Sequence, residues 1–339
     1  MISIVVPTLG RPSLAALLAA LGPLPPEVEL VVVDDRPAPH PPLAVDFLDA
    51  KVVAGPARGP AAARNAGVRA AHGDWIAFLD DDVLPDSDWI IRLREDLEAA
   101  GSEVGGVQGT LRVPLPPDRR PTDWERVTAG LADGAWITAD MAYRRAALAG
   151  AGGFDERLPR AFREDADLAF RVRRDGWTLT RGNRRVTHPV RPESPWVSIR
   201  TQRGNADDAL LRRLYGPEWR SLLEIPPGRR SRHAAVTLAG TVALSAAAAA
   251  LLGSGRPSWG RGVWAAAAIG AGLGWAAGTA EFAAARIAPG PRTPREVGTM
   301  LVTSVVIPPV AVVHWLRGAW RWRKAEPLVP AAAPVGASR

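Results

Sequence analysis

Short apolar runs alternate with stretches of helical composition over residues 2–79. Three of these runs, residues 2–6, 27–33 and 75–79, have the length and composition of buried strands, and residues 52–53 are a short strand candidate. Between them, residues 13–21 and 61–71 have helical composition, and Ser13 is placed to cap the first of these helices. This alternation predicts an α/β domain with a mainly parallel sheet and helices on both faces.

The pattern is less regular in the middle of the chain. Residues 101–121 are rich in glycine, proline and arginine, which predicts irregular strands and a loop. The other elements expected in this part are helices at 122–131, 144–148 and 168–174 and a strand at 185–187. Connectors rich in proline and arginine follow at 189–194 and 225–232, and the second is the predicted domain boundary.

Three apolar stretches follow this boundary, at residues 234–253, 263–280 and 300–316. Each is close to the ~20 residues that cross a bilayer, and the first two contain no charged side chain. Because alanine is only mildly apolar, a buried helical hairpin of a soluble protein is the alternative. The third stretch contains Pro308 and Pro309, which predict a kinked or interfacial helix.

Arginines beside these stretches predict their orientation. Six of them lie outside the hairpin formed by the first two stretches: Arg229, Arg230, Arg232, Arg286, Arg292 and Arg295. The turn between the two stretches holds only Arg256 and Arg261. Positive charge concentrates on the cytoplasmic side of membranes, so both ends of the hairpin are expected there. The third stretch is then expected as a basic helix on the cytoplasmic face, with tryptophans at headgroup level.

These observations give a domain plan. Residues 1–225 are expected to form a catalytic domain on the cytoplasmic side of the cell membrane, and residues 226–233 a basic linker. Residues 234–324 form the expected membrane region, and 325–339 a disordered tail. Met1 leads straight into the first strand, so no signal peptide is expected.

Composition narrows the chemistry. The 339 residues include no cysteine, which excludes disulfides, cysteine-bound zinc and thiol nucleophiles, and fits a reducing compartment. The net charge is +7 and comes almost entirely from arginine. Nucleic acid is not an expected partner, because the arginines form no compact patch interleaved with aromatic residues. Arginines flanking apolar runs fit a membrane surface instead.

Two acidic clusters lie directly after predicted strands. Asp34 and Asp35 follow residues 27–33, and Asp80-Asp81-Asp82 follows residues 75–79. Ligands gather at the carboxyl ends of strands in such sheets. An extended Asp-x-Asp segment places its first and third carboxylates on one side, where they suit the hard cations Mg²⁺ and Mn²⁺. A solvated turn is the alternative for the second cluster, and a turn or helix cap for the first.

Three further features carry weaker signals. Arg64 lies in a predicted helix, where its guanidinium is able to pair with a diphosphate. Glu164 and Asp165 begin a predicted helix, which fits either helix capping or a general base. His188 follows a predicted strand, and a structural histidine is favoured over a metal ligand.

Taken in order, these motifs resemble the family 2 glycosyltransferases of the GT-A fold over about the first two-thirds of the chain. The segments that carry the resemblance are Ile2-Ser3-Ile4-Val5-Val6-Pro7-Thr8, Val33-Asp34-Asp35, Ala63-Arg64-Asn65-Ala66-Gly67, Gly73-Asp74-Trp75-Ile76-Ala77-Phe78-Leu79-Asp80-Asp81-Asp82, Met141-Ala142-Tyr143-Arg144-Arg145, Gly152-Gly153-Phe154-Asp155-Glu156 and Glu164-Asp165-Ala166-Asp167-Leu168.

The resemblance implies a sugar transfer that inverts the anomeric carbon, from a nucleotide-diphosphate sugar to a glycan or lipid-linked acceptor. It implies donor binding by Pro7, Thr8, Asp34, Asp35, Asp80 and Asp81 near the strand ends, and by Arg64 in the predicted helix. A divalent metal, Mn²⁺ or Mg²⁺, is expected on Asp80 and Asp82, with His188 as a further candidate ligand. Asp165 is the expected catalytic base, with Glu164 orienting it or the acceptor.

Two departures from the family pattern bear on specificity. Arg36-Pro37 stands where many relatives have Gly-Ser, and Asp140 stands where relatives often have asparagine. Two other functions remain as alternatives: a catalytically degenerate membrane scaffold or nucleotide-sugar sensor, and a sugar-phosphate nucleotidyltransferase. The loop after the first strand is short and poor in glycine, which argues against the nucleotidyltransferase.

Overall fold

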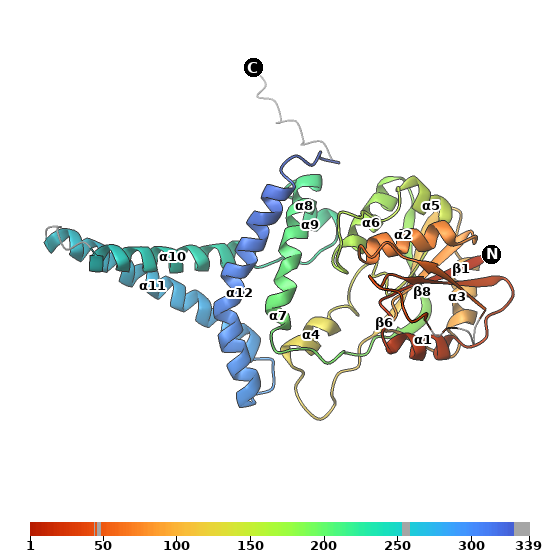
Figure 1. The fold of residues 1–339 in the computed structure, drawn as a ribbon, viewed down its shortest axis with the longest axis horizontal. Coiled ribbons are helices and arrows are strands. Elements are labelled where there is room, and N and C mark those ends of the chain that lie inside the picture. The colour runs from red at the N-terminus through yellow and green to blue at the C-terminus, as the bar shows by residue number, and fades with distance from the viewer. Residues whose placement is uncertain (44, 46–48, 253–257, 329–339) are drawn as a thin grey trace, which may run out of the picture. The chain divides into compact units, whose positions relative to one another are not determined.

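A computed structural model describes residues 1–43, 45, 49–252 and 258–328 (Figure 1). The chain divides into two compact units. Unit 1 comprises Met1–Leu115, Val127–Arg191 and Trp219–Ile225. Unit 2 comprises Pro116–Arg126, Pro192–Glu218 and the described part of Pro226–Arg339. Two segments of the region expected to be catalytic therefore belong to unit 2.

The described residues of unit 1 contain an eight-stranded sheet in the order β3-β2-β1-β4-β7-β6-β8-β5. Its strands are β1 (Ile2–Thr8), β2 (Val28–Asp34), β3 (Ala50–Ala54), β4 (Trp75–Leu79), β5 (Leu84–Pro85), β6 (Val104–Arg112), β7 (Asp140–Arg144) and β8 (Thr178–Thr187). The first four strands are parallel, as predicted. β7 is antiparallel to both β4 and β6, so the sheet as a whole is mixed.

The register of the parallel strands fixes where the site lies. Thr8, the last residue of β1, pairs with Asp34, the last residue of β2. β4 is parallel to β1 on its other side and ends at Leu79, just before the acidic cluster. The carboxyl ends of β1, β2 and β4 therefore meet at one edge of the sheet.

Helices cover both faces of the sheet, as the apolar pattern predicts. α1 (Ser13–Leu21) and α3 (Trp89–Glu98) share a core with strand residues such as Ile4 and Leu30. α2 (Pro60–Ala70), α5 (Arg145–Gly150) and α6 (Glu164–Arg174) pack on the opposite face. Central strands buried on both faces read as unbroken apolar runs, which is why the sequence located them.

The start of α1 differs from the prediction. Pro12 is the N-cap residue and Ser13 is the first residue of the helix. The Ser13 hydroxyl is buried and has no hydrogen-bond partner within the described ranges. The predicted cap is therefore wrong. The proline ring, with its fixed φ, begins this helix instead.

Unit 2 is helical. It contains α7 (Val197–Arg200), η1 (Thr201–Gly204), α8 (Asn205–Tyr215), α10 (Arg230–Leu252), α11 (Ser258–Ile287) and α12 (Pro294–Arg321). Two short helices complete the fold: α4 (Asp123–Ala129), shared between the units, and α9 (Trp219–Leu222) in unit 1. Within the described residues, α10, α11 and α12 are long and apolar enough to cross a membrane.

The predicted third apolar stretch, residues 300–316, lies within a longer helix, α12. It continues through Pro308 and Pro309 without a break. Each proline removes one helical N–H donor. Burial of Ile307, Pro308 and Ala311 within unit 2 offsets that loss. In the most apolar segment of α12, a third of the residues are buried. The corresponding fraction is 6% in α10 and zero in α11.

The end of the chain is described only in part. Within the predicted tail, 325–339, the backbone N–H of Leu328 donates to Leu214 O at 2.9 Å. Residues 329–339 lie outside the described residues, as does residue 253, the last of the first apolar stretch.

Candidate active site

Asp81 links the end of β1 to the end of β4. Its carboxylate accepts a 2.6 Å hydrogen bond from Thr8 Oγ1 and a 2.8 Å hydrogen bond from Arg11 Nη1. Asp81 is only 2% exposed, and Thr8 is buried as well. Asp81 thus joins the end of β1 to the segment after β4, and both of its oxygens are occupied. Arg11 was not anticipated from the sequence, which marks it only by its place in the loop after the first strand.

Asp34 is held by Arg36. The Arg36 guanidinium donates from Nε to Asp34 Oδ1 at 2.8 Å and from Nη2 to Oδ2 at 2.7 Å. This two-point contact lowers the pKa of Asp34 below its usual value. Arg36 Nη2 also donates to Pro41 O at 2.9 Å. Asp34, the carboxylate expected to read the base, is therefore paired with Arg36. Arg36 is one of the residues at which the sequence departs from the family pattern.

Asp35 orders the loop that leads into α2. Its Oδ1 accepts from the Ala57 N–H at 2.7 Å, and its Oδ2 accepts from the Gly59 N–H at 3.1 Å. Gly59 has φ +95°, and a Cβ atom there would lie 2.1 Å from Pro159 O. Pro60 then starts the helix. Asp35 and Gly59 therefore fix the position from which α2 presents Arg64.

Arg64 lies at the centre of the site. Its Nη2 donates to Asp80 Oδ1 and its Nη1 donates to Glu164 Oε1, each at 2.7 Å. The side chain is 2% exposed and lies over the Phe154 ring, 5.5 Å from the centroid. One buried guanidinium thus joins the acidic cluster after β4 to the acidic pair that begins α6.

The second metal candidate, Asp82, lies beside two residues from the end of β8. His188 Nε2 is 3.6 Å from Asp82 Oδ1, and Arg191 Nε is 3.0 Å from Oδ2. His188 Nδ1 lies 3.2 Å from Pro189 O. The structure therefore brings His188 to the acidic cluster. Arg191 was missed, because the sequence shows it only as one arginine of a connector.

Asp80-Asp81-Asp82 does not adopt the extended conformation expected from its spacing. Asp81 and Asp82 lie in a turn, and the Val83 N–H donates to Asp80 O at 3.3 Å. Asp80 and Asp82 are nevertheless close enough for the charge of Asp80 to raise the pKa of Asp82. Local backbone hydrogen bonding, rather than strand extension, sets their geometry.

Four carboxylates lie in this region: Asp80, Asp82, Glu164 and Asp165. Together they carry more negative charge than the neighbouring arginines carry positive charge. Burial, followed by the neighbouring Asp165, raises the pKa of Glu164 to about 7. Burial also raises the pKa of Asp165 and of Asp82, and the charge of Asp80 adds to both shifts. Arg64, which contacts Asp80 and Glu164, and Arg191, which contacts Asp82, offset only part of this negative charge. An excess of buried negative charge is what a divalent cation would neutralise.

Asp80 and Asp82 fit such a cation. No cluster of three histidine, cysteine, aspartate or glutamate residues suited to a metal occurs within the described ranges. Mg²⁺ and Mn²⁺ bound with a nucleotide need only one or two carboxylates, since phosphate oxygens and water complete the shell. In addition, Glu164 Oε2 is buried without a hydrogen-bond partner among the described residues.

Asp165 is placed in the first turn of α6. Its Oδ1 accepts a 2.7 Å hydrogen bond from the Ala166 N–H. Arg163, just before the helix, has φ +77°, so the chain turns sharply at this point. A partly exposed carboxyl with a raised pKa suits a general base, which must gain a proton during the reaction.

Asp140, the other departure from the family pattern, is a buried structural residue. Trp89 Nε1 donates to Asp140 Oδ2 at 2.9 Å, and Arg184 Nε donates to Oδ1 at 2.7 Å. Arg184 also pairs with Asp96 at 3.1 Å. This network joins α3, β7 and β8, and it occupies both oxygens of Asp140.

Comparison with known families decides what this domain is. Residues 3–128 match the family described as glycosyl transferase family 2. The chain contains a family 2 glycosyltransferase domain. The matched segment of the glycosyltransferase domain includes the strand ends of β1, β2 and β4 and all of α2. The resemblance inferred from the motifs is confirmed, as is the fold class of an α/β domain followed by long apolar helices.

A curated relative extends this comparison. Succinoglycan biosynthesis protein ExoO of Rhizobium meliloti (strain 1021) is 41% identical over 87 residues. The match covers 23% of this chain and 23% of the relative, so the chain spans about a quarter of the length of the curated relative it matches.

Solved structures show more distant likeness. S. aureus TarS 1–349 in complex with UDP-GlcNAc is 14% identical, has a TM-score of 0.42, and matches over 96% of this chain and 92% of its own. Glucosyl-3-phosphoglycerate synthase from Mycobacterium tuberculosis, solved with Mn²⁺, UDP and glucosyl-3-phosphoglycerate, is 20% identical with a TM-score of 0.44. That match covers 67% of this chain and 81% of the synthase. The assignment of the glycosyltransferase domain rests on the family match and not on these likenesses.

Proposed function

We propose that the chain is an inverting, metal-dependent glycosyltransferase that uses a nucleotide-diphosphate sugar. The observation that carries the proposal is the Arg64 bridge, which joins Asp80 of the acidic cluster to Glu164 beside the candidate base. These groups come from separate parts of the sequence, and a solvated turn or a simple helix cap would have no reason to converge on one buried arginine.

Each residue then has a role in the transfer. Asp165 takes the proton from the acceptor hydroxyl, whose oxygen forms a bond to the anomeric carbon from the face opposite the leaving group. The bond between that carbon and the diphosphate oxygen breaks, and the diphosphate departs with the electron pair. Asp80 and Asp82 would hold Mn²⁺ or Mg²⁺, which would supply positive charge to the leaving group. Arg64 is a positioning residue, because its Nη1 and Nη2 hold Glu164 and Asp80 in place.

We further propose a cell-envelope or lipid-linked glycan as the acceptor. The apolar helices α10, α11 and α12 support attachment to a membrane. Arginines before α10 and after α11 support a cytoplasmic catalytic domain. The name of the curated relative, a succinoglycan biosynthesis protein, supports a glycan as the acceptor.

The test is a transfer assay on the full chain in detergent. A thermal-shift screen of nucleotide sugars with and without Mn²⁺ first identifies the donor, because a ligand of the folded state raises the melting temperature. Transfer to an envelope-lipid extract is then compared for the wild type, Asp82→Ala and Asp165→Asn. We expect both variants to lose activity, and Asp165→Asn to keep donor binding. Full activity in Asp165→Asn would overturn the assigned base, and tight donor binding without turnover in the wild type would favour the sensor.

A further inference from the structure

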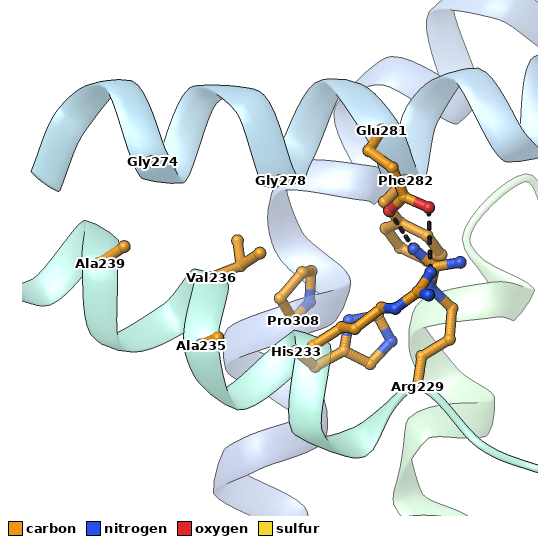
Figure 2. Close-up of a pocket in the computed structure, with 11 residues that line it drawn as sticks. Arg229, His233, Ala235, Val236, Ala239, Gly274, Gly278, Glu281, Phe282 and Pro308 are labelled. Carbon is orange, nitrogen blue, oxygen red and sulfur yellow. Dashed lines mark hydrogen bonds and ion pairs between the residues drawn. The ribbon is translucent and has the colours of Figure 1, made fainter.

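A cavity of about 570 Å³ lies among α10, α11 and α12, wholly within unit 2 (Figure 2). Charged and polar groups gather at one part of its lining: Arg229, Arg232 and Glu281 are charged, and His233 lies beside them. The rest of the lining is apolar and consists mostly of small residues. The cavity therefore has two chemical halves, one charged and one suited to hydrocarbon.

The charged half presents two guanidinium groups held by one carboxylate. Arg229 Nη2 donates to Glu281 Oε2, and Arg232 Nη1 donates to Oε1 at 3.2 Å. The Arg229 guanidinium also lies 5.0 Å from the centroid of the Phe282 ring. Its Nε is buried and has no hydrogen-bond partner in the part of the chain that the structure describes. Two cations against one anion leave a net positive charge, together with an unused donor.

A nearby arginine does not add to this charge. Arg286 lies just beyond the cavity on α11, and its guanidinium pairs with Asp123 at 2.7 Å. It also donates to Thr303 Oγ1 at 2.7 Å. The electrostatic attraction of the cavity for an anion therefore comes from Arg229 and Arg232.

The apolar half is made by small side chains on facing helices. Ala239 on α10 lies across from Gly274 on α11, and Figure 2 shows Val236 and Gly278 one turn nearer to the charged groups. A Cβ atom at Gly278 would lie 2.5 Å from Val236 Cγ2, so the helices touch there. Large apolar residues farther along both helices are exposed, including Leu244 at 76% and Leu273 at 67%. The cavity thus continues onto surface that hydrocarbon chains would cover.

We propose that this cavity binds a membrane lipid with an anionic phosphate head group. The phosphate is held by Arg229 and Arg232, and a hydrocarbon chain runs along the small residues of α10 and α11. Arginine donates two parallel hydrogen bonds to phosphate oxygens. Basic pockets between membrane helices suit anionic lipid head groups for this reason. The inference concerns binding alone and stands apart from the sugar transfer.

The experiment measures lipid binding to the full chain purified in a neutral detergent. Phosphatidic acid and phosphatidylcholine with identical acyl chains are titrated, and bound lipid is counted by native mass spectrometry. Glycerol 3-phosphate serves as the soluble phosphate. We expect one phosphatidic acid per chain, bound about tenfold or more tightly than phosphatidylcholine, which corresponds to ~1.4 kcal/mol. Glycerol 3-phosphate should not compete, because it lacks the chain.

Variants locate the site. Arg229→Gln with Arg232→Gln should reduce phosphatidic acid binding to the level of phosphatidylcholine. The matched control, Arg292→Gln with Arg295→Gln, removes one exposed arginine from the loop before α12 and one from the first turn of α12, and should bind as the wild type does. Ala239→Leu fills the apolar half and should weaken binding of both lipids.

Three results would overturn the proposal. The first is unchanged preference for phosphatidic acid in the Arg229 and Arg232 double variant. The second is equal binding of glycerol 3-phosphate, which would indicate a soluble phosphate site. The third is a dimer that excludes lipid, which would make the cavity an interface between two copies.

Discussion

Arg64 Nη2 lies 2.7 Å from Asp80 Oδ1, and the same guanidinium contacts Glu164 through Nη1. The arginine is buried, so it acts in a medium where a charge is costly without its partners. Sixteen residues separate Arg64 from Asp80 and a hundred separate it from Glu164. The site therefore depends on a contact between α2, the turn after β4 and the start of α6.

Removal of Arg64 should destabilise the protein as well as inactivate it. Arg64→Met leaves Asp80 and Glu164 without their shared cation, and we expect a loss of about 3–5 kcal/mol in the free energy of unfolding. Urea denaturation monitored by circular dichroism measures this. Arg69→Met, on the exposed face of the same helix, should change it by less than about 0.5 kcal/mol. Equal effects of the two substitutions would refute the central role of the bridge.

Asp82 should control the response to metal. With Asp82→Ala, we expect the Mn²⁺-dependent rise in melting temperature with nucleoside diphosphate to be lost, because one of two cation ligands is missing. The control is Asp88→Asn, because Asp88 is an exposed carboxylate close to Asp82 in the sequence. A full Mn²⁺-dependent shift in Asp82→Ala would exclude Asp82 as a ligand.

Stability should depend on pH through Glu164. The pKa of Glu164 is about 7 in the folded protein, above its ordinary value of 4.5, because of burial. The folded state therefore favours the protonated acid. This stabilisation is complete below pH 4.5 and is lost as the pH rises through about 7. In EDTA, the wild type should lose about 1–3 kcal/mol relative to Glu164→Gln over that interval. A pH-independent difference between the two proteins would contradict the assignment.

Arg36 should influence which base is bound. Arg36→Ala frees the Asp34 carboxylate to accept the ring N–H of uracil, whereas cytosine has no hydrogen on that nitrogen. We expect the preference for UDP over CDP to rise about tenfold, equivalent to ~1.4 kcal/mol. Calorimetric titration of both nucleotides in Mn²⁺ checks this, and an unchanged ratio would show that Asp34 does not read the base.

Gly59 should tolerate no side chain. In Gly59→Ala the Cβ would meet Pro159 O at 2.1 Å in a backbone conformation of φ +95°. Gly152→Ala is matched in its positive φ of +75°, but no described atom lies within 4 Å of its Cβ position. We expect Gly59→Ala to be the more destabilising by about 1–3 kcal/mol in thermal unfolding. The reverse order would mean that the loop before α2 adjusts freely.

The sequence by itself determined the parallel strands, the helices between them, the acidic clusters at the strand ends and the three apolar helices. These features follow from local periodicity and composition, which are properties of neighbouring residues. The sequence also identified Arg36 as a departure from the family pattern, but it did not predict that Arg36 contacts Asp34. The prediction that Ser13 caps the first helix was wrong, because the N-cap residue is Pro12.

Only the tertiary structure decided the partners of the charged side chains. Arg64 joins two carboxylates, Asp35 orders a loop, and Asp140 belongs to a buried network with Arg184. An arginine pairs with whichever carboxylate the fold brings close to it, and such pairs join residues more than a hundred positions apart, as in Arg191 with Asp82 and Arg286 with Asp123. Because these partners are far apart in sequence, local periodicity locates the strand ends but does not predict which charged side chains form ion pairs there.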